Sequence, residues 1–191
     1  MMQVRQTELP GVLLIEPRLF SDDRGFFTEQ FNARAFAEVT GFNGHFVQDN
    51  LSQSLRGVVR GLHYQLERPQ AKLVTCLRGE IWDVAVDLRR NSPHFGRWTG
   101  FYLSESNRIQ AWIPPGFGHG FVATSEVAEV FYKVDDFRYA EGERSILWND
   151  PQLGIDWPVT PAQARLSPKD AEATVLLHAQ VYETGMPGAW Q

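Results

Sequence analysis

The alternation of apolar and polar residues between positions 46 and 134 predicts a series of short β-strands. Apolar side chains recur there at every second position, and Gly, Pro and Asn interrupt the runs. About eight short strands at this spacing are typical of a β-sandwich or a closed β-barrel. We therefore predict a mainly β fold, with strands at 46–54, 58–65, 72–79, 80–88, 98–104, 109–114, 119–124 and 129–134.

The N-terminal part is expected to add short elements to this framework. An apolar run at 12–16 predicts a strand, and a turn at 22–25 leads into another. Asn32 is a suitable N-cap for a short helix that Gly41 would end.

The C-terminal part is irregular and rich in proline. Ser167 and Pro168 have the character of a helix start, so we predict a second short helix over 169–182. No linker or internal repeat interrupts the pattern, and we expect one domain over residues 1–191.

Composition narrows the classes of protein that fit. Hydrophobic residues make up 43% of the 191 residues, enough for a core, and the net charge of −5 gives no general affinity for nucleic acid or lipid. No apolar run approaches the ~20 residues of a membrane span. The single cysteine, Cys76, excludes an internal disulfide and fits a reducing compartment. We expect a cytoplasmic protein without nucleic-acid or membrane partners, in which Cys76 is buried.

One histidine stands out as the candidate for chemistry. The spacing of Gly57, His63 and Gly79 is typical of a small cupin-type β-barrel. In a metal-binding cupin a second histidine follows the first after one residue, and here that place is Gln65. A metal site is therefore the less favoured interpretation, and we expect none.

Alternation places further polar residues on the inward faces of the strands. A closed barrel would bring such residues together at its mouth, where these folds bind ligands. Each residue also has a purely structural interpretation: a hydrogen-bonded core histidine, a solvated lysine, charges at a sheet edge or a core tyrosine. The residues concerned are His63, Lys72, Asp83, His119 and Tyr132.

A histidine, a lysine and a tyrosine together suit proton abstraction next to a carbonyl group. His63 would remove the proton, and the Lys72 ammonium would stabilise the resulting enolate. Tyr132 on the opposite face would return a proton and invert the carbon. No G-x-G-x-x-G or P-loop motif occurs in the chain, so we expect no cofactor.

Several longer motifs resemble the dTDP-4-dehydrorhamnose 3,5-epimerase family. They lie between Arg24 and Asp170, and include RGLHYQ, GEIWDVAVDLRRNSPHFGRW, WIPPGFGHGF, EVFYKV, ILWNDP and SPKD. The resemblance implies a metal-free cupin fold, a double-stranded β-helix or jelly-roll barrel, in a homodimer. It also implies a dTDP-sugar substrate: dTDP-4-keto-6-deoxy-D-glucose, epimerised at C3 and C5 to dTDP-4-keto-L-rhamnose.

The same resemblance implies a role for individual residues. His63 is expected to be the general base, with Asp170 as its partner. Tyr132 is expected to be the acid, and Lys72 the enolate stabiliser. The expected substrate contacts are Arg24, Phe27, Glu29, Gln48, Asn50, Arg60, Asp83 and His119.

One departure from the family pattern bears on the reaction. Phe137 stands where the family often has a tyrosine, and that residue is expected near the ligand. Alternatives therefore stay open at this point: an epimerase of a single carbon, a 3,4-ketoisomerase, or a non-catalytic sugar-binding cupin.

Overall fold

The described part of the chain, residues 2–183 of the computed structural model, consists mainly of antiparallel β-strands. Its helical segments are short: α1 (Ala33–Thr40) and α2 (Pro168–Ala171) are α-helical, and η1 (Ala140–Gly142) and η2 (Leu176–His178) are 3-10 turns. The strands are β1 (Gln3–Gln6), β2 (Leu13–Glu16), β3 (Leu19–Asp22), β4 (Gly25–Thr28), β5 (Gln48–Leu55), β6 (Val59–Gln65), β7 (Lys72–Arg78), β8 (Glu80–Asp87), β9 (Trp98–Ser104), β10 (Gln110–Ile113), β11 (Phe117–Ala123), β12 (Val127–Val134) and β13 (Glu143–Ser145).

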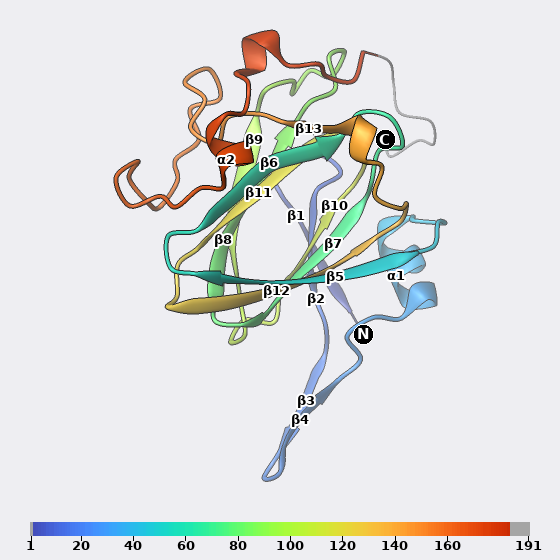
Figure 1. Cartoon of the computed structure of the whole chain (residues 1–191). Coiled ribbons are helices and arrows are strands. Elements are labelled where there is room, and N and C mark those ends of the chain that lie inside the picture. Colours follow the sequence, from blue (N-terminus) through green and yellow to red (C-terminus); the bar gives the residue numbers. More distant parts are fainter. Residues whose placement is uncertain (1, 184–191) are drawn as a thin grey trace.

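Two antiparallel sheets lie against each other and form the body of the molecule (Figure 1). The six-stranded sheet has the order β1-β2-β10-β7-β12-β5, and the five-stranded sheet has the order β13-β6-β11-β8-β9. Consecutive strands such as β6 and β7 lie in different sheets, so the chain passes repeatedly from one sheet to the other. The mainly β class predicted from the sequence is confirmed.

The strands predicted between positions 46 and 134 are all present, with ends that shift by at most two residues. Strand β3 of the hairpin was not predicted, and neither were β1 and β13 of the two large sheets. Their sequences, QVRQ and ERS, are largely polar and carry no apolar alternation. Both lie at the edge of a sheet, where one partner strand is enough to hold them.

Helix α1 forms as its capping residues predict. The Asn32 side chain accepts hydrogen bonds from the amides of Arg34 and Ala35, both at 3.1 Å. Gly41 ends the helix in the left-handed conformation, with φ of 74°. The helix buries Phe36 against Trp112 of β10.

The helix predicted over 169–182 is wrong beyond its first turn. Ser167 caps α2 as expected, but the helix ends at Ala171. The following backbone bonds to the barrel instead: the amide of Leu147 donates to Thr174, and the amide of Tyr182 donates to Leu88. These contacts hold the segment in a path that one continuous helix would not allow, and within it Leu176–His178 forms the 3-10 turn η2.

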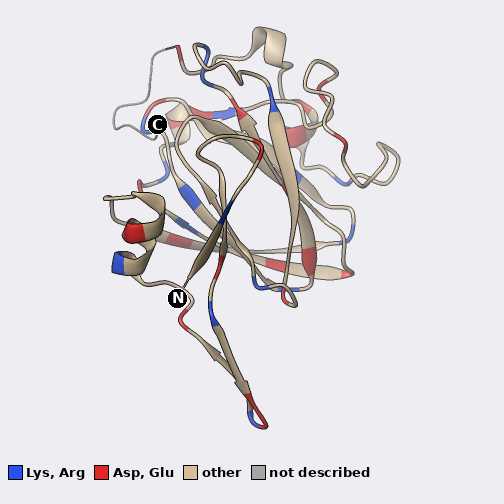
Figure 2. Ribbon diagram, turned by 180° about the vertical axis from the view of Figure 1, so that it is seen from behind, with Lys and Arg blue, Asp and Glu red and all other residues tan. Residues whose placement is uncertain are grey.

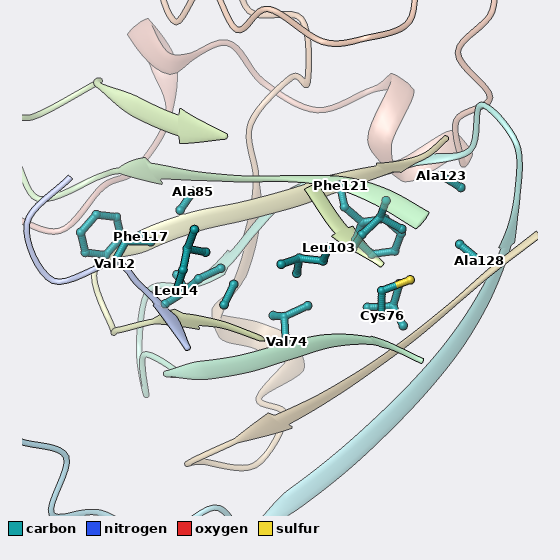
Figure 3. Packing of buried hydrophobic residues seen from close by; sticks show 14 of the residues in the cluster. Val12, Leu14, Val74, Cys76, Ala85, Leu103, Phe117, Phe121, Ala123 and Ala128 are labelled. Carbon is teal, nitrogen blue, oxygen red and sulfur yellow. The ribbon is translucent and has the colours of Figure 1, made fainter. Parts of the chain in front are cut away.

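The main core lies between the two sheets (Figure 3). Val74 and Cys76 of β7 face Phe117 and Phe121 of β11 across this layer. The expected burial of Cys76 is confirmed, and burial raises the pKa of its thiol to about 12. Cys76 is therefore a packing residue and a poor nucleophile at neutral pH.

Two further clusters cover the outer faces of the sheets. Helix α1 packs over Leu73 and Trp112 of the six-stranded sheet. The segment that follows β13 covers the five-stranded sheet, where Leu62 and Tyr64 point away from the barrel interior. Because side chains alternate along a strand, this burial turns His63 of the same strand inward. No helix among residues 2–183 is long and apolar enough to span a membrane.

The hairpin of β3 and β4 extends away from the body of the molecule (Figures 1 and 2). Its apolar side chains are unusually exposed, and Phe27 keeps 68% of its surface accessible. The other exposed apolar residues of the hairpin are Leu19, Phe20 and Phe26. Figure 2 also shows acidic and basic residues interspersed over the ribbon.

Candidate active site

A cavity of about 190 Å³ opens between the edge of the six-stranded sheet and strands β6 and β13. One wall comes from β5, β7 and β12, and the other from β6, β13 and the loops beside them. The lining residues are Gln48, Asn50, His63, Tyr64, Gln65, Gln70, Lys72, Tyr132, Arg138, Glu143, Arg144 and Lys169.

His63 is joined to Asp170 by a hydrogen bond of 2.5 Å between Nε2 and Oδ1. Asp170 is buried, and its second oxygen accepts a hydrogen bond from the Ser167 hydroxyl at 2.8 Å. Burial acts to raise the pKa of Asp170, but the hydrogen bond and charge of His63 outweigh it and the pKa is lowered. Because an ionised Asp170 can only accept, the neutral form of His63 carries its proton on Nε2, and Nδ1 then has a free lone pair.

A close approach of two strands brings His63 into this position. Gly61 has a φ of +129°, and a Cβ on it would lie 2.5 Å from the Cα of Gly120 on β11. Strands β6 and β11 can come this near because both residues are glycines and carry no Cβ. The register of the two strands shifts at this point and sets His63 opposite His119.

Lys72 enters the cavity from β7 and is desolvated there. Burial lowers the pKa of its ammonium to about 8, although the charges of Asp83 and Glu143 act to raise it. A lysine that is protonated yet weakly hydrated is well suited to stabilise charge on a carbonyl oxygen.

Asp83 and His119 form a buried pair behind the cavity, with His119 Nε2 2.9 Å from Asp83 Oδ2. Burial raises the pKa of Asp83, against the charge of His119, and lowers the pKa of His119. Neither residue lines the cavity, and Asp83 is wholly buried. Asp83 therefore lies deeper than the mouth of the barrel, and ligand contact by either residue stays a prediction.

Tyr132 stands on the wall opposite His63. It belongs to β12, in the six-stranded sheet, whereas His63 belongs to the five-stranded sheet. Burial raises the pKa of its hydroxyl, although the charge of Arg60 opposes this, so the phenol stays protonated at neutral pH. A proton donor and a proton acceptor thus face one cavity from two sides.

Three of the predicted substrate contacts lie in the cavity or beside it. Gln48 and Asn50 line the cavity, and the amide of Gln48 donates to Oδ1 of Asn50 at 2.8 Å. Arg60 lies beside the cavity, where it donates to the Ser54 hydroxyl and the Gln53 carbonyl at 3.0 and 3.1 Å.

Arg24, Phe27 and Glu29 lie on or beside the projecting hairpin, away from this cavity. Arg24 forms an exposed ion pair with Asp22. Within one chain these three residues do not lie beside His63, because the hairpin points out of the barrel that it belongs to, and their contact with a substrate stays a prediction.

Sequence reasoning missed a charged group on the His63 side of the cavity. Glu143 is bonded to Arg138 at 2.6 Å and to Lys169 at 3.0 Å, and these bonds, Arg138 first, lower its pKa to about 2. Lys169 belongs to the SPKD motif and directly precedes Asp170, so this motif could have identified it. Arg138 and Glu143 lie on irregular segments or a very short strand, where alternation gives no signal. The ring of Phe137, expected near the ligand, does not line the cavity.

The chain is similar to known proteins over most of its length. The model of the family dTDP-4-dehydrorhamnose 3,5-epimerase matches residues 6–178, most of the chain. The chain belongs to this family. A dTDP-4-dehydrorhamnose 3,5-epimerase of Pseudomonas aeruginosa is 54% identical over 181 residues, which are 95% of this chain and 99% of the relative.

Other members of the dTDP-4-dehydrorhamnose 3,5-epimerase family show the fold and the range of reactions. A crystal structure of a dTDP-6-deoxy-D-glucose-3,5-epimerase from Legionella pneumophila, in complex with dTDP-4-keto-L-rhamnose, matches with a TM-score of 0.94. It is 46% identical, and the match covers 97% of this chain and 100% of that one. This match confirms the predicted cupin-type barrel. A dTDP-4-dehydrorhamnose 3-epimerase of Streptomyces niveus is 41% identical over 94% of this chain and 86% of the relative.

Proposed function

We infer that the protein is a dTDP-4-dehydrorhamnose 3,5-epimerase. It converts dTDP-4-keto-6-deoxy-D-glucose to dTDP-4-keto-L-rhamnose by inverting C3 and C5 of the sugar. The observation that carries this inference is the pair of proton-transfer groups on opposite walls of one cavity: His63, held by Asp170, and Tyr132.

The reaction begins with proton abstraction next to the C4 ketone. Nδ1 of His63 takes the proton, the electrons of the C–H bond form a C=C bond, and the carbonyl electrons move onto oxygen. The Lys72 ammonium donates a hydrogen bond to that oxygen and stabilises the enolate.

Inversion follows when Tyr132 donates its proton to the opposite face of the same carbon. The electron pair on oxygen reforms the carbonyl, and the carbon has changed configuration. Solvent returns a proton to Tyr132 and removes one from His63, whose side chain is 38% exposed. The steps are repeated at the second carbon. They involve no net oxidation, so the mechanism needs no redox cofactor, and the Lys72 ammonium supplies the positive charge at the carbonyl oxygen.

The alternatives fit the site less well. A 3-epimerase of Streptomyces niveus is a relative, but it is less similar than the 3,5-epimerase of Pseudomonas aeruginosa, with 41% against 54% identity. This difference favours inversion at two carbons. A sugar-binding cupin without activity would have no use for a buried carboxylate bonded to the cavity histidine.

A second copy of the chain completes the site. Arg24, Phe27 and Glu29 are predicted substrate contacts, yet their own hairpin carries them away from the cavity. Exposed apolar side chains, among them Phe20 and Phe27, are typical of surfaces that a partner covers. In a homodimer each hairpin reaches the cavity of the other subunit, where the guanidinium of Arg24 and the ring of Phe27 bind the nucleotide. The dimer is a cytoplasmic enzyme, in keeping with its free thiol.

The buried Lys72 predicts a fall in activity at alkaline pH. The cationic form stabilises the enolate, and its pKa is lowered to about 8, so the ammonium is lost as the pH rises through that value. We expect kcat to decline with an apparent pKa near 8, while Tyr132 stays protonated. In Lys72→Arg the remaining activity should lose this decline, because a guanidinium does not titrate there. A wild-type rate that is constant from about pH 7 to 9.5 would contradict the assignment.

Replacement of Tyr132 by Phe should separate proton exchange from inversion. The variant keeps His63, Asp170 and Lys72, so it still removes a proton and incorporates solvent deuterium. Inversion should fall by about 10²–10⁴-fold, because a positioned general acid contributes that much. Incubation with the dTDP-4-keto sugar in deuterated water, followed by mass spectrometry and NMR, measures both processes.

His63→Ala is the matched control and should abolish exchange as well as inversion. Inversion by Tyr132→Phe at a near wild-type rate would show that another group is the acid.

Subunit mixing tests whether the hairpin serves the partner. Arg24→Ala and His63→Ala homodimers should both be weakly active or inactive. After the two are unfolded together and refolded, about half of the dimers are mixed, and each mixed dimer has one cavity with His63 and a partner Arg24. Activity should then recover to about one quarter of the wild-type value. No recovery, or a monomer in light scattering, would refute the shared site.

A further inference from the structure

The hairpin of β3 and β4 carries no polar contact to its own barrel. Within residues 2–183, no hydrogen bond or ion pair joins positions 19–28 to a strand of the barrel. The two strands bond to each other, and the Thr28 hydroxyl donates to the carbonyl of Arg18 just before the hairpin. A two-stranded hairpin on its own is only marginally stable in water. Some other contact must therefore fix the direction in which it projects (Figure 1).

Arg108 makes such a contact. It lies in the turn between β9 and β10, and its guanidinium carbon is 4.3 Å from the centre of the Phe26 ring on β4. A cation at this distance over an aromatic ring is attracted to the negative face of the ring. Among residues 2–183, Arg108 forms no ion pair with a carboxylate that would compete for its charge.

The turn that carries Arg108 is held by its own hydrogen bonds. Oδ1 of Asn107 accepts from the amides of Ser104 and Ile109, both at 3.0 Å. The Arg108 amide donates to the Ser104 carbonyl at 3.0 Å. Arg108 itself has a φ of 55°, a left-handed conformation that glycine adopts at less cost. Its side chain therefore leaves the backbone from a fixed point.

The same stretch of chain also holds the base of the hairpin. Gln110, two residues after Arg108, is buried, and its Nε2 donates to the carbonyl of Gln30 at 2.9 Å. Gln30 follows β4 by two residues. A contact at the base alone would leave the hairpin free to pivot. A second contact at Phe26, next to the hairpin turn, fixes its direction.

The contact with Arg108 leaves the opposite face of the hairpin free. Phe26 and Phe27 are neighbours on one strand, so their rings lie on opposite faces. Phe27 is in register with Phe20 of β3, and their ring centres are 6.3 Å apart. Both of these rings are exposed. One face of the hairpin is thus held by its own chain, and the face with Phe27 remains for a ligand.

We propose that Arg108 is a positioning residue: through its contact with Phe26 it sets the direction in which the hairpin presents Arg24 and Phe27 to the cavity of the other subunit. The proposal rests on the shared site inferred above. Arg108 touches no substrate in this role. Its loss should weaken nucleotide binding and leave proton transfer intact.

Loss of the contact is measured as a split between binding and turnover. In Arg108→Met, the Kd of dTDP by calorimetry and KM for the dTDP-4-keto sugar should rise about two- to fivefold, the effect of one exposed cation–π contact. The value of kcat should stay within about 1.5-fold, because the proton-transfer groups are untouched. Arg90→Met is the matched control: Arg90 lies 4.9 Å from the Phe95 ring, away from the cavity and the hairpin, and its loss should change neither quantity.

Two further variants separate positioning from stability. Arg108→Gly removes the side chain but adopts a φ of 55° without strain. It should unfold at no lower temperature than the wild type, yet bind dTDP as weakly as Arg108→Met. Phe26→Leu removes the ring from the other side of the contact. In that background, Arg108→Met should raise the Kd by less than about 1.5-fold.

Mixed dimers show which cavity the contact serves. They are isolated with two different affinity tags, so that each dimer has one cavity with His63. If one subunit carries His63→Ala and the other Arg108→Met, the active cavity receives an intact hairpin, and KM should equal the wild-type value. If one subunit carries both substitutions and the other is wild type, the active cavity receives the loosened hairpin. KM should then be raised as in the Arg108→Met homodimer.

Each contrary result overturns a defined claim. Unchanged Kd and KM in Arg108→Met would show that this contact does not direct the hairpin, and recovery of activity between Arg24→Ala and His63→Ala subunits would show that the shared site still stands. Effects of Arg108→Met and Phe26→Leu that multiply would show that Arg108 acts without this ring. A raised KM in the first mixed dimer alone would show that the hairpin serves its own cavity. A wild-type protein that binds dTDP but exchanges no deuterium would instead overturn the proposed function itself.

Discussion

The hydrogen bond between His63 and Asp170 is the interaction on which the rest of the site depends. It joins strand β6 to the short helix α2, across 107 positions of sequence. Ser167 caps that helix and donates a hydrogen bond to the same carboxylate. Formation of the helix therefore places the carboxylate that orients the imidazole. The bond leaves His63 with a proton on Nε2 and a basic Nδ1. A histidine without this partner would sample both tautomers.

The other groups are arranged around this base by the two-sheet architecture. Residues of β6 and β12 face each other across the cavity because they belong to different sheets. Lys72 on β7 lies deep enough for burial to lower its pKa, yet Asp83 and Glu143 keep much of its cationic character. Glu143 is itself compensated by Arg138 and Lys169, which limits the cost of its charge beside the substrate. The charge state of each of these groups therefore depends on the charges beside it.

Much of this was predictable from sequence, and the exceptions have physical causes. Strand alternation identified His63, Lys72 and Tyr132, since side-chain direction follows from the pleat. Asp170 required the family resemblance, because no local pattern connects it to His63. Arg138 was missed because it lies in a loop. The helix predicted after Ala171 was wrong, since bonds to the barrel outweigh local helix propensity. The motif that contains Arg24 and Phe27 gave no sign that its hairpin points away from the cavity of its own chain.

The central claim is that Asp170 orients the His63 imidazole so that Nδ1 acts as the base. The most direct test is to measure which ring nitrogen of His63 carries the proton. Long-range proton–nitrogen correlation NMR on protein with 15N-labelled histidine, at a pH where His63 is neutral, distinguishes the protonated ring nitrogen from the bare one. His63→Ala identifies its signals. If this claim holds, Nε2 carries the proton in the wild type, and Asp170→Ala shows a mixture of tautomers. A proton on Nδ1 in the wild type would contradict it, because the nitrogen assigned to remove the substrate proton would then be blocked.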